Sequence, residues 1–224
     1  MAVKRNPRAK RRGVKLTRAE KNDLVRQRLF GAAVKVVGKY GYADASVARI
    51  TKLANVAQGT FYNHFANRQE LLDQLLPTVG KDMLAFIKKR VDPAAGEADK
   101  ELARFKAFFA FLTETPEFMR ILNEAIVFAP IGYQKHIEVI SENYMRALTR
   151  GQVGEGQFTP KELEVVIFIL LGARSYLSHH YAYVDSQVQT PPDYLFTAYH
   201  KLITMGPFSD STARKKATPK KVLS

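Results

Sequence analysis

The sequence contains no cysteine, and this absence excludes two kinds of site at once. Without a thiol, the chain can form neither a disulfide framework nor a thiolate metal site. It also lacks an apolar run of membrane-spanning length, because the longest, at residues 165–173, is about half of what a span needs. The N-terminus has no apolar segment typical of a secretory signal. We therefore expect a soluble, cytoplasmic protein.

Acidic residues are scarce, and they are scarcest in the first third of the chain. The whole sequence has 21 acidic residues against 35 lysines and arginines, a net charge of +14. Residues 1–70 hold 16 lysines and arginines but only 4 acids, whereas residues 71–207 are nearly neutral, with 14 against 16. Such a concentration of positive charge favours binding to nucleic-acid phosphates through the N-terminal third.

No segment gives a convincing strand pattern, and nearly all of the chain is predicted to be helical. Thr17 and Glu20 form a capping-box pair before an apolar stripe that ends at Gly41, and Thr159 to Glu162 mark a second helix start. Two short helices are expected between residues 46 and 64. The remaining helices are predicted at about residues 68–90, 100–114, 116–128, 131–150, 160–183 and 191–205. The fold class is therefore all-α, with about nine helices.

Residues 46–72 carry the most specific pattern. Ser46 can cap a helix whose apolar positions have the spacing of one buried stripe: Val47, Ile50, Leu53 and Ala54. Asn55 follows, a residue that tolerates the left-handed conformation of a tight turn. A second short helix, about residues 57–64, buries Phe61 and Phe65. Two short helices joined in this way are typical of a helix-turn-helix that reads DNA.

The outer face of the second short helix has the residue types that contact DNA. Gln58, Thr60 and Asn63 can read base edges. Tyr62, His64 and the backbone amides near Gly59 can bind phosphate. An ordinary helical hairpin with chance polar residues is the alternative interpretation. Asn67 with Glu70 then forms a capping-box-like pair that begins the next helix.

The segment GTFYNHFANRQELL, residues 59–72, resembles the DNA-binding signature of the TetR family of bacterial regulators. The upstream segment AAVKVVGKYGYADASVARITKLANVAQGTFY is similar to the family as well, and the resemblance covers about residues 22–76. Two positions depart from the family pattern. Asn55 stands where the family commonly has glycine, and Ala57 where it often has a capping serine. The second difference costs about 1 kcal/mol of cap stability or one phosphate contact.

The resemblance implies a division of the chain and a set of DNA contacts. The expected segments are a disordered basic arm at 1–16, a three-helix helix-turn-helix DNA-binding domain at 17–66, a helical effector-binding and dimerisation domain at 67–206, and a disordered basic tail at 207–224. The expected DNA-binding residues are Ser46, Lys52, Gln58, Gly59, Thr60, Tyr62, Asn63, His64 and Arg68.

A dimeric, ligand-responsive transcriptional regulator, most simply a repressor, is the function that the resemblance implies. Two copies on a two-fold axis would meet successive major grooves of a palindromic operator. The predicted helix at 160–183 is apolar around most of its circumference and must be covered on more than one side. By resemblance, the last two helices would form the homodimer interface.

The second domain is rich in aromatic residues, which either fill its core or line a cavity between helices. By resemblance, such a cavity would bind a small, largely apolar or aromatic effector that weakens operator binding. Its candidate residues are Phe105, Phe109, Phe128, Tyr144, Phe168 and Arg174. Arg174 lies in an apolar sector, where an unpaired charge is costly. It pairs either with a ligand carboxylate or, as we favour, with an acidic residue of its own chain or of the dimer mate.

Two features, the basic arm and Pro77, each have two interpretations, and a third, the histidine pair, does not indicate a metal site. The basic arm is either a minor-groove contact or a solubilising tail. Pro77 either provides a hinge or fixes a kink in the helix that enters the second domain. His179 and His180 are adjacent and point about 100° apart on a helix, a poor metal pair, so we expect neither metal nor cofactor.

Two other function classes compete with the regulator. No nucleophile–base pair, phosphate loop or metal spacing indicates an enzyme. The stronger alternative is a constitutive, weakly sequence-selective architectural DNA-binding protein. Such a protein would not need the long, nearly neutral, aromatic-rich second domain.

Overall fold

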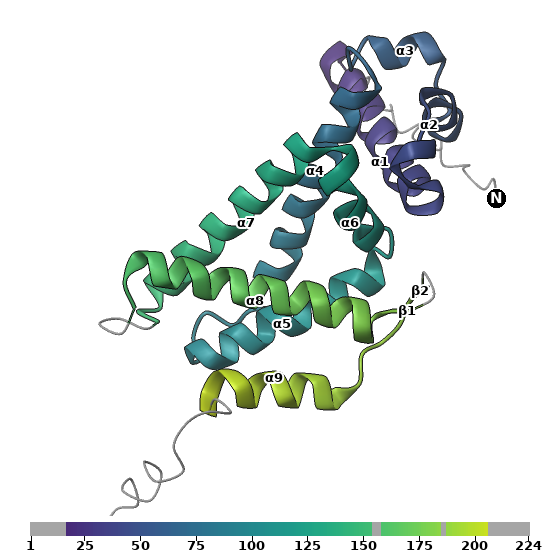
Figure 1. The fold of residues 1–224 in the computed structure, drawn as a ribbon. Coiled ribbons are helices and arrows are strands. Elements are labelled where there is room, and N and C mark those ends of the chain that lie inside the picture. Colours follow the sequence, from purple (N-terminus) through teal and green to yellow (C-terminus); the bar gives the residue numbers. More distant parts are fainter. Residues whose placement is uncertain (1–16, 154–157, 185–186, 206–224) are drawn as a thin grey trace, which may run out of the picture.

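The computed structural model describes residues 17–153, 158–184 and 187–205, and over these residues it contains nine helices (Figure 1). The basic arm and tail predicted from the sequence lie outside the described residues. The helices are α1 (Arg18–Asp44), α2 (Val47–Ala54), α3 (Gln58–Tyr62), α4 (Arg68–Lys88), α5 (Glu97–Glu114), α6 (Phe118–Phe128), α7 (Pro130–Arg150), α8 (Pro160–Tyr181) and α9 (Asp193–Met205).

The structure corrects three local expectations. A two-stranded antiparallel hairpin, β1 (Tyr183–Val184) and β2 (Gln187–Val188), follows α8, although no strand was expected. Two residues per strand are too few to give a readable alternation in the sequence. Helix α6 begins at Phe118 and not at residue 116, so Pro116 precedes the helix. Helix α5 begins at Glu97, before the predicted start at about residue 100.

Side-chain caps set the starts of four helices, as the sequence predicted. Complete capping boxes at Thr17 and Thr159 open α1 and α8. The Ser46 hydroxyl accepts from the Arg49 amide at the start of α2, and the Asn67 side chain accepts from the Glu70 amide at the start of α4. Each cap satisfies a backbone donor that has no partner within the helix.

Helices α1 to α3 form a small unit with its own buried residues. Ile50, Phe61 and Phe65 are almost fully buried there, and Asn55 adopts the expected left-handed conformation between α2 and α3. Leu53 is 56% exposed, so its assignment to the buried stripe was wrong. Thr51 is buried instead. It lies on the same face of α2 as Ile50 and Ala54, whereas Leu53 is rotated away from that face.

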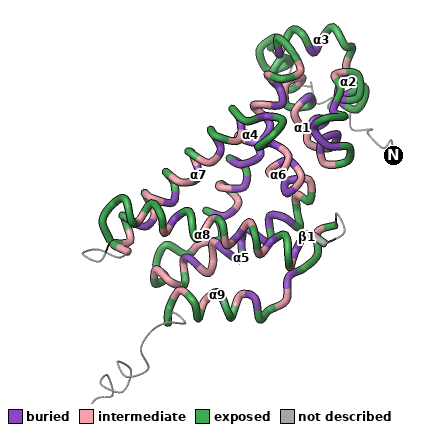
Figure 2. The backbone as a smooth tube through the Cα atoms, in the orientation of Figure 1, coloured by how far each residue is buried: buried purple, intermediate pink, exposed green. Residues whose placement is uncertain are grey.

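Helix α4 leaves this unit and enters the larger bundle formed by α5 to α9 (Figure 1). It packs against α5, α6 and α7, and its contact with α7 is the most extensive between any two described elements. Figure 2 shows the buried positions along the inner sides of these helices and exposed stretches along α8 and α9. Among the described residues, no helix combines the length and apolar character needed to cross a bilayer.

Two glycines allow α4 and α7 to approach closely. A Cβ atom added to Gly132 would lie 2.3 Å from the carbonyl oxygen of Asp73. A Cβ atom added to Gly80 would lie 2.2 Å from Nδ1 of His136. Both distances are too short for a real Cβ atom. The close spacing of α4 and α7 therefore requires glycine at both positions.

Candidate DNA-binding surface and ligand cavity

The outer face of α3 is open to solvent. Gln58, Gly59, Tyr62 and Asn63 are exposed, and Thr60 is half-buried. Phe61 and Phe65 anchor this helix from its inner side, with ring centroids 5.3 Å apart. A single turn of helix therefore presents several polar side chains on a fixed support.

The start of α3 has the weakness expected from the sequence. Ala57 occupies the N-cap position and provides no side-chain hydrogen bond. The first amide groups of a helix have no intrahelical acceptor and attract anions. Apart from its chain neighbours and the backbone of its own helix, no described residue has a heavy atom within 4 Å of the place where a Cβ of Gly59 would be. The backbone can therefore be approached closely at this point.

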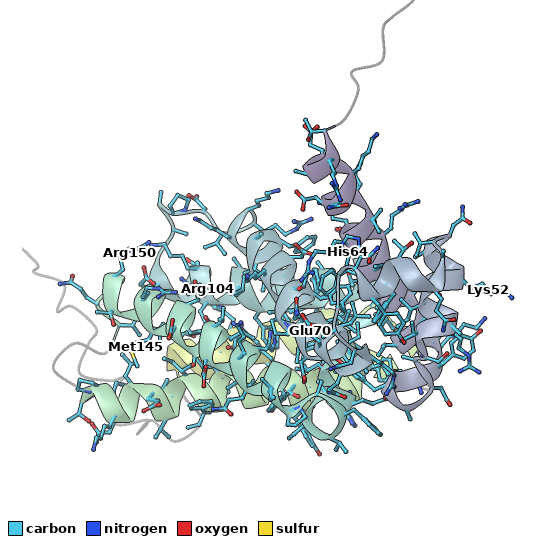
Figure 3. All side chains as sticks on the ribbon, turned by 90° about the horizontal axis from the view of Figure 1, so that it is seen from above. Lys52, His64, Glu70, Arg104, Met145 and Arg150 are labelled. Carbon is cyan, nitrogen blue, oxygen red and sulfur yellow. The ribbon has the colours of Figure 1, made fainter. Side chains whose placement is uncertain are left out.

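Three further predicted DNA-binding residues lie on the same unit. Ser46 is exposed at the start of α2, and Lys52 is exposed near its end. The side chain of His64 is half-buried, and its carbonyl oxygen accepts from Nη1 of Arg26 at 3.1 Å. Figure 3 shows Lys52 at one extremity of the molecule, far from Arg104 and Arg150 at the other.

Arg68 was expected to hold a phosphate, and the structure gives it a different role. Its Nε donates to the carbonyl oxygen of Ala45 at 2.7 Å, and its Nη2 donates to the carbonyl oxygens of Tyr42 and Ala43. The guanidinium therefore binds the turn between α1 and α2 to the first residue of α4. Arg68 therefore positions the helix-turn-helix unit, and its contact with phosphate stays a prediction.

Arg26 is a second positioning residue, which the sequence did not indicate. Its guanidinium lies 4.6 Å from the ring centroid of Phe65 and donates to the side chain of Gln74 at 2.6 Å. It thereby links α1, the end of α3 and α4. Only a tertiary structure places these groups together, so no local pattern in the sequence indicated them.

A cavity of about 1290 Å³ lies within the second bundle, between α4, α5, α6, α7 and α8. Three of the predicted effector-binding residues line it: Tyr144, Phe168 and Arg174. Phe105 and Phe109 do not. Phe105 stacks on Tyr199 of α9 at 3.8 Å, and Phe109 packs on Phe105 and Phe196 as core.

Phe128 also lies outside the cavity. It stacks on Tyr42 at 6.3 Å, where the end of α6 meets the end of α1. The expectation that Phe105, Phe109 and Phe128 line this cavity is therefore wrong. Aromatic residues at helical spacing fill a core or line a cavity equally well, and only the packing of the helices separates the two.

Arg174 pairs with Glu101 of its own chain, the alternative favoured from the sequence. Its Nη2 lies 2.7 Å from Oε1 of Glu101 and also donates to the hydroxyl of Tyr144. The same carboxylate accepts from the hydroxyls of Tyr144 at 2.5 Å and Tyr199 at 2.7 Å. Four buried side chains from α5, α7, α8 and α9 thus share one hydrogen-bonded network, which the sequence did not indicate.

The ionisation of these groups follows from burial and their neighbours. Burial raises the pKa values of Tyr144 and Tyr199, so both hydroxyls remain protonated donors. Burial alone would lower the pKa of Arg174, but the neighbouring Tyr144 and Glu101 raise it. A protonated guanidinium therefore lines the cavity.

Two elements connect the cavity to the N-terminal unit. Helix α4 lines the cavity near its end, through Met83 and Lys88, and carries Arg68 at its start. Helix α6 also lines the cavity and contacts α1. Its Arg120 donates to the carbonyl oxygen of Lys39 at 3.0 Å, and its Glu124 accepts from the Tyr42 amide at 2.7 Å.

Gly41 lies at this contact with α6. Its φ of +81° interrupts α1 at the predicted position, next to the side chains of Arg120 and Glu124.

Among the described residues, no group of three or more histidine, aspartate or glutamate side chains is arranged to hold a metal ion.

Comparison with known sequences places the N-terminal unit among bacterial regulators. Residues 29–75 match the family described as bacterial regulatory proteins, tetR family. A curated relative, an uncharacterised HTH-type transcriptional regulator of Haemophilus influenzae, is 31% identical over 107 residues. That alignment covers 48% of this chain and 57% of the relative.

Solved structures share the fold over most of the chain. The fatty acid degradation regulator FadR of Bacillus halodurans superposes with a TM-score of 0.65 at 20% identity, covering 82% of this chain and 96% of that one. FadR of Bacillus subtilis, solved in complex with stearoyl-CoA, gives a TM-score of 0.62 at 19% identity, covering 81% and 98%. At such identities the similarity establishes a shared fold.

Proposed function

Because this chain is a DNA-binding transcriptional regulator of the TetR family, we propose that it acts as a dimeric repressor that a small effector releases from a palindromic operator. The observation that carries the proposal is the pairing of two surfaces on one continuous helix. Helix α4 begins at the exposed helix-turn-helix unit and ends at a large cavity. We also propose the division at residues 66 and 67 into a DNA-binding domain and an effector-binding and dimerisation domain, and action in the cytoplasm.

The proposed DNA contacts follow from exposure. Gln58, Thr60 and Asn63 face base edges, because their side chains project from the outer part of a helix and the major groove is wide enough to admit a helix. Phosphate contacts come from the remaining members of the set: Ser46, Lys52, Tyr62, His64, Arg68 and the amides near Gly59. These groups fix the register of the protein on DNA and carry no sequence information themselves.

Release follows from a movement of α4. An effector in the cavity contacts the C-terminal part of α4, while Arg68 holds the N-terminal part to the DNA-binding unit. A displacement of α4 would change the separation of the two units in a dimer and weaken binding to both half-sites. Operator DNA must then weaken effector binding by the same factor.

Pro77 lies between these two parts of α4 and is the proposed hinge. A Pro77→Ala variant restores the missing backbone N–H donor and removes the ring that favours a kink, so the helix is expected to be straighter at this position. If its operator affinity falls on effector addition as much as that of the parent, Pro77 is only a fixed kink.

The exposed apolar faces of α8 and α9 support a dimer. Val165, Ile169 and Tyr176 lie along one face of α8, at helical spacing, and all are more than half exposed. Gly172 falls within the same stripe and has open space beside it. Apolar residues grouped in this way mark a protein–protein interface.

Selection of bound sequences from a random duplex pool, at two salt concentrations, tests the function. An enriched palindrome with steep salt dependence is the expected result. Binding without an enriched motif would instead favour the constitutive architectural protein. The enriched duplex then serves as the probe for effector release.

A further inference from the structure

The two ends of the cavity differ in chemistry. One end, between α6 and the first turns of α7, is lined by apolar and aromatic side chains. They are Phe118, Leu122, Ile126, Tyr133 and Ile137. Polar side chains also line this part of the cavity: Asn123, Gln134, His136 and Glu138. Because Glu138 is exposed, its carboxylate stays hydrated when an apolar group enters this end.

The opposite end, where the end of α4, the start of α5 and the last turns of α7 meet, is strongly basic. Its cavity-lining cations are Lys88, Lys100, Arg104, Arg146 and Arg150. Among the described residues, the acidic side chain that lines this end is Glu97, which pairs with Lys100 at 2.7 Å. Figure 3 shows Arg104 and Arg150 at the same end of the molecule.

These cations are only partly neutralised by the protein. Arg104 lies 3.4 Å from the Glu101 carboxylate, which already pairs with Arg174, and Arg146 lies 3.6 Å from Glu142. Within the described ranges, no acidic side chain lies within 4 Å of the ammonium group of Lys88 or the guanidinium of Arg150. Positive charge that collects at one end of a cavity attracts an anion.

Arg174 adds an independent observation. It lines the cavity, it is only 6% exposed, and its Nε has no hydrogen-bond acceptor among the described residues. A buried donor without an acceptor is costly, and a ligand oxygen would remove that cost. The neighbouring network places this donor next to Glu101, and therefore close to Arg104.

The cavity is elongated. Its lining residues on α7 run from Tyr133 to Arg150, and at 1.5 Å per residue these positions span roughly 25 Å. The apolar and basic groups therefore lie at opposite ends of a long site. A compact ligand would reach one end only.

We propose that the cavity binds an elongated amphipathic anion, with an unbranched apolar body directed toward α6 and a carboxylate or phosphate head among the basic residues of α4, α5 and α7. This ligand class rests on the proposed function, because it specifies the effector of the same cavity. Arg174 donates a hydrogen bond from its Nε to an oxygen of the ligand at the junction of head and body.

Calorimetric titration of the full-length protein, without DNA, tests the ligand class directly. The probes are dodecanoate, dodecyl phosphate and dodecanol, each below its aggregation concentration, together with inorganic phosphate. At least one of the two anions should bind tenfold or more tightly than dodecanol, and inorganic phosphate should bind weakest. The comparison of carboxylate with phosphate identifies the head group.

Variants at the basic end test the placement of the head. Lys88 and Arg150 are exposed, so Lys88→Ala and Arg150→Ala should fold normally and weaken the anion by about two- to fivefold each, with no effect on dodecanol. Lys135→Ala is the matched control, because Lys135 is an exposed cation of α7 that does not line the cavity. It should bind every probe as the parent does.

Arg174→Lys tests the inner contact, because it keeps a positive charge near Glu101 and removes the Nε donor. It should weaken the anions at least tenfold if its thermal unfolding matches that of the parent. If the variant is unfolded, the Lys88 and Arg150 variants decide the question alone.

The proposal is overturned if dodecanol binds as tightly as both anions, or if none of the probes binds. It is also overturned if the Lys88 and Arg150 variants bind the anions as the parent does. Failure of the proposed function would look different. An anion that binds with the expected pattern but leaves operator affinity unchanged would preserve the ligand class and contradict effector-controlled release.

Discussion

Arg174 and Glu101 are 73 residues apart in the chain, yet the guanidinium and the carboxylate meet at 2.7 Å inside the second bundle. The carboxylate also accepts from Tyr144 and Tyr199, so one acidic side chain organises four helices. Because the group is buried, removal of the Glu101 charge leaves the Arg174 guanidinium without an acidic partner in a poorly solvated place, whereas Glu101 has a second cation, Arg104, at 3.4 Å.

Glu101→Gln should therefore lower the free energy of unfolding by about 3–5 kcal/mol. The double variant Glu101→Leu with Arg174→Met should lose much less, because it removes both charges and retains most of the buried volume. Urea unfolding at fixed protein concentration measures both effects. A double variant less stable than Glu101→Gln would show that the ion pair itself stabilises the fold.

Gly59→Ala should separate DNA binding from folding. The added methyl group meets no described side chain and no backbone outside its own helix within 4 Å, and alanine favours a helix by about 1 kcal/mol over glycine. The variant should unfold at the same temperature or higher, and bind DNA more weakly, because its Cβ faces the proposed phosphate contact.

Gly31→Ala is the matched control, since Gly31 in α1 also has open space around it. It should change stability in the same direction and leave operator affinity unchanged. If the Gly59 variant and the parent bind DNA with equal affinity, DNA does not approach the backbone closely at this residue.

The local features of the fold were predictable because they depend on neighbouring residues. The capping boxes at Thr17 and Thr159, the left-handed Asn55 and the interruption at Gly41 were each visible in the sequence. Such features are fixed by hydrogen bonds over three or four residues, or by the steric limits of one residue. Element bounds were accurate wherever a cap determined them.

The cavity was only partly predictable because it depends on how helices pack. The sequence indicated that Arg174 pairs with an acidic group, but not that the partner is Glu101 on a distant helix. Phe105 was expected to line the cavity, but its ring stacks on Tyr199 of α9. The packing of distant helices determines this contact, so the local sequence does not indicate it. Lys100 and Arg104 lie four residues apart on α5, a spacing that places two cations on one face of a helix.

Lys52→Ala and Gln58→Ala should weaken DNA binding in different ways. Loss of a phosphate contact at Lys52 should reduce affinity for all duplexes and lower the slope of log affinity against log salt by about 1. Loss of a base contact at Gln58 should cost about 1–3 kcal/mol at one base pair of each half-site and relax specificity there. Salt titrations with the operator and a point-mutated duplex distinguish them. A change in base preference in the Lys52→Ala variant would contradict the phosphate contact and would indicate that Lys52 reads a base.

His136 should make the protein less stable in mild acid. Burial lowers its pKa to about 4, from 6.5 for an accessible histidine. The unfolded chain therefore takes up a proton below about pH 6.5 while the folded chain does not, so stability falls as the pH falls. Between pH 7 and pH 5 this group should cost about 2 kcal/mol.

The His136→Gln variant isolates that contribution, because every other titrating group is unchanged. Its unfolding free energy should fall less steeply between pH 7 and pH 5 than that of the parent. His180→Gln, at an exposed position of α8, should follow the parent curve. Parallel curves for all three proteins would mean that His136 is protonated in the folded state.

Ile169→Glu should dissociate the proposed dimer. Ile169 is 63% exposed in the single chain and lies on the stripe that contains Val165, Gly172 and Tyr176. A carboxylate at the centre of an apolar contact loses its water without gaining a partner, at a cost of roughly 3 kcal/mol, which corresponds to about a hundredfold weaker dimer. Sedimentation over a concentration series measures that constant.

Ile131→Glu provides the matched control, because Ile131 is equally exposed, at 71%, but lies at the start of α7 and away from both apolar faces. It receives the same new charge and should sediment as the parent does. The Ile169 variant should also lose affinity for the palindrome, since one half-site alone holds a monomer weakly. If both variants sediment alike, the two chains meet through another surface and the stripe on α8 serves a different partner.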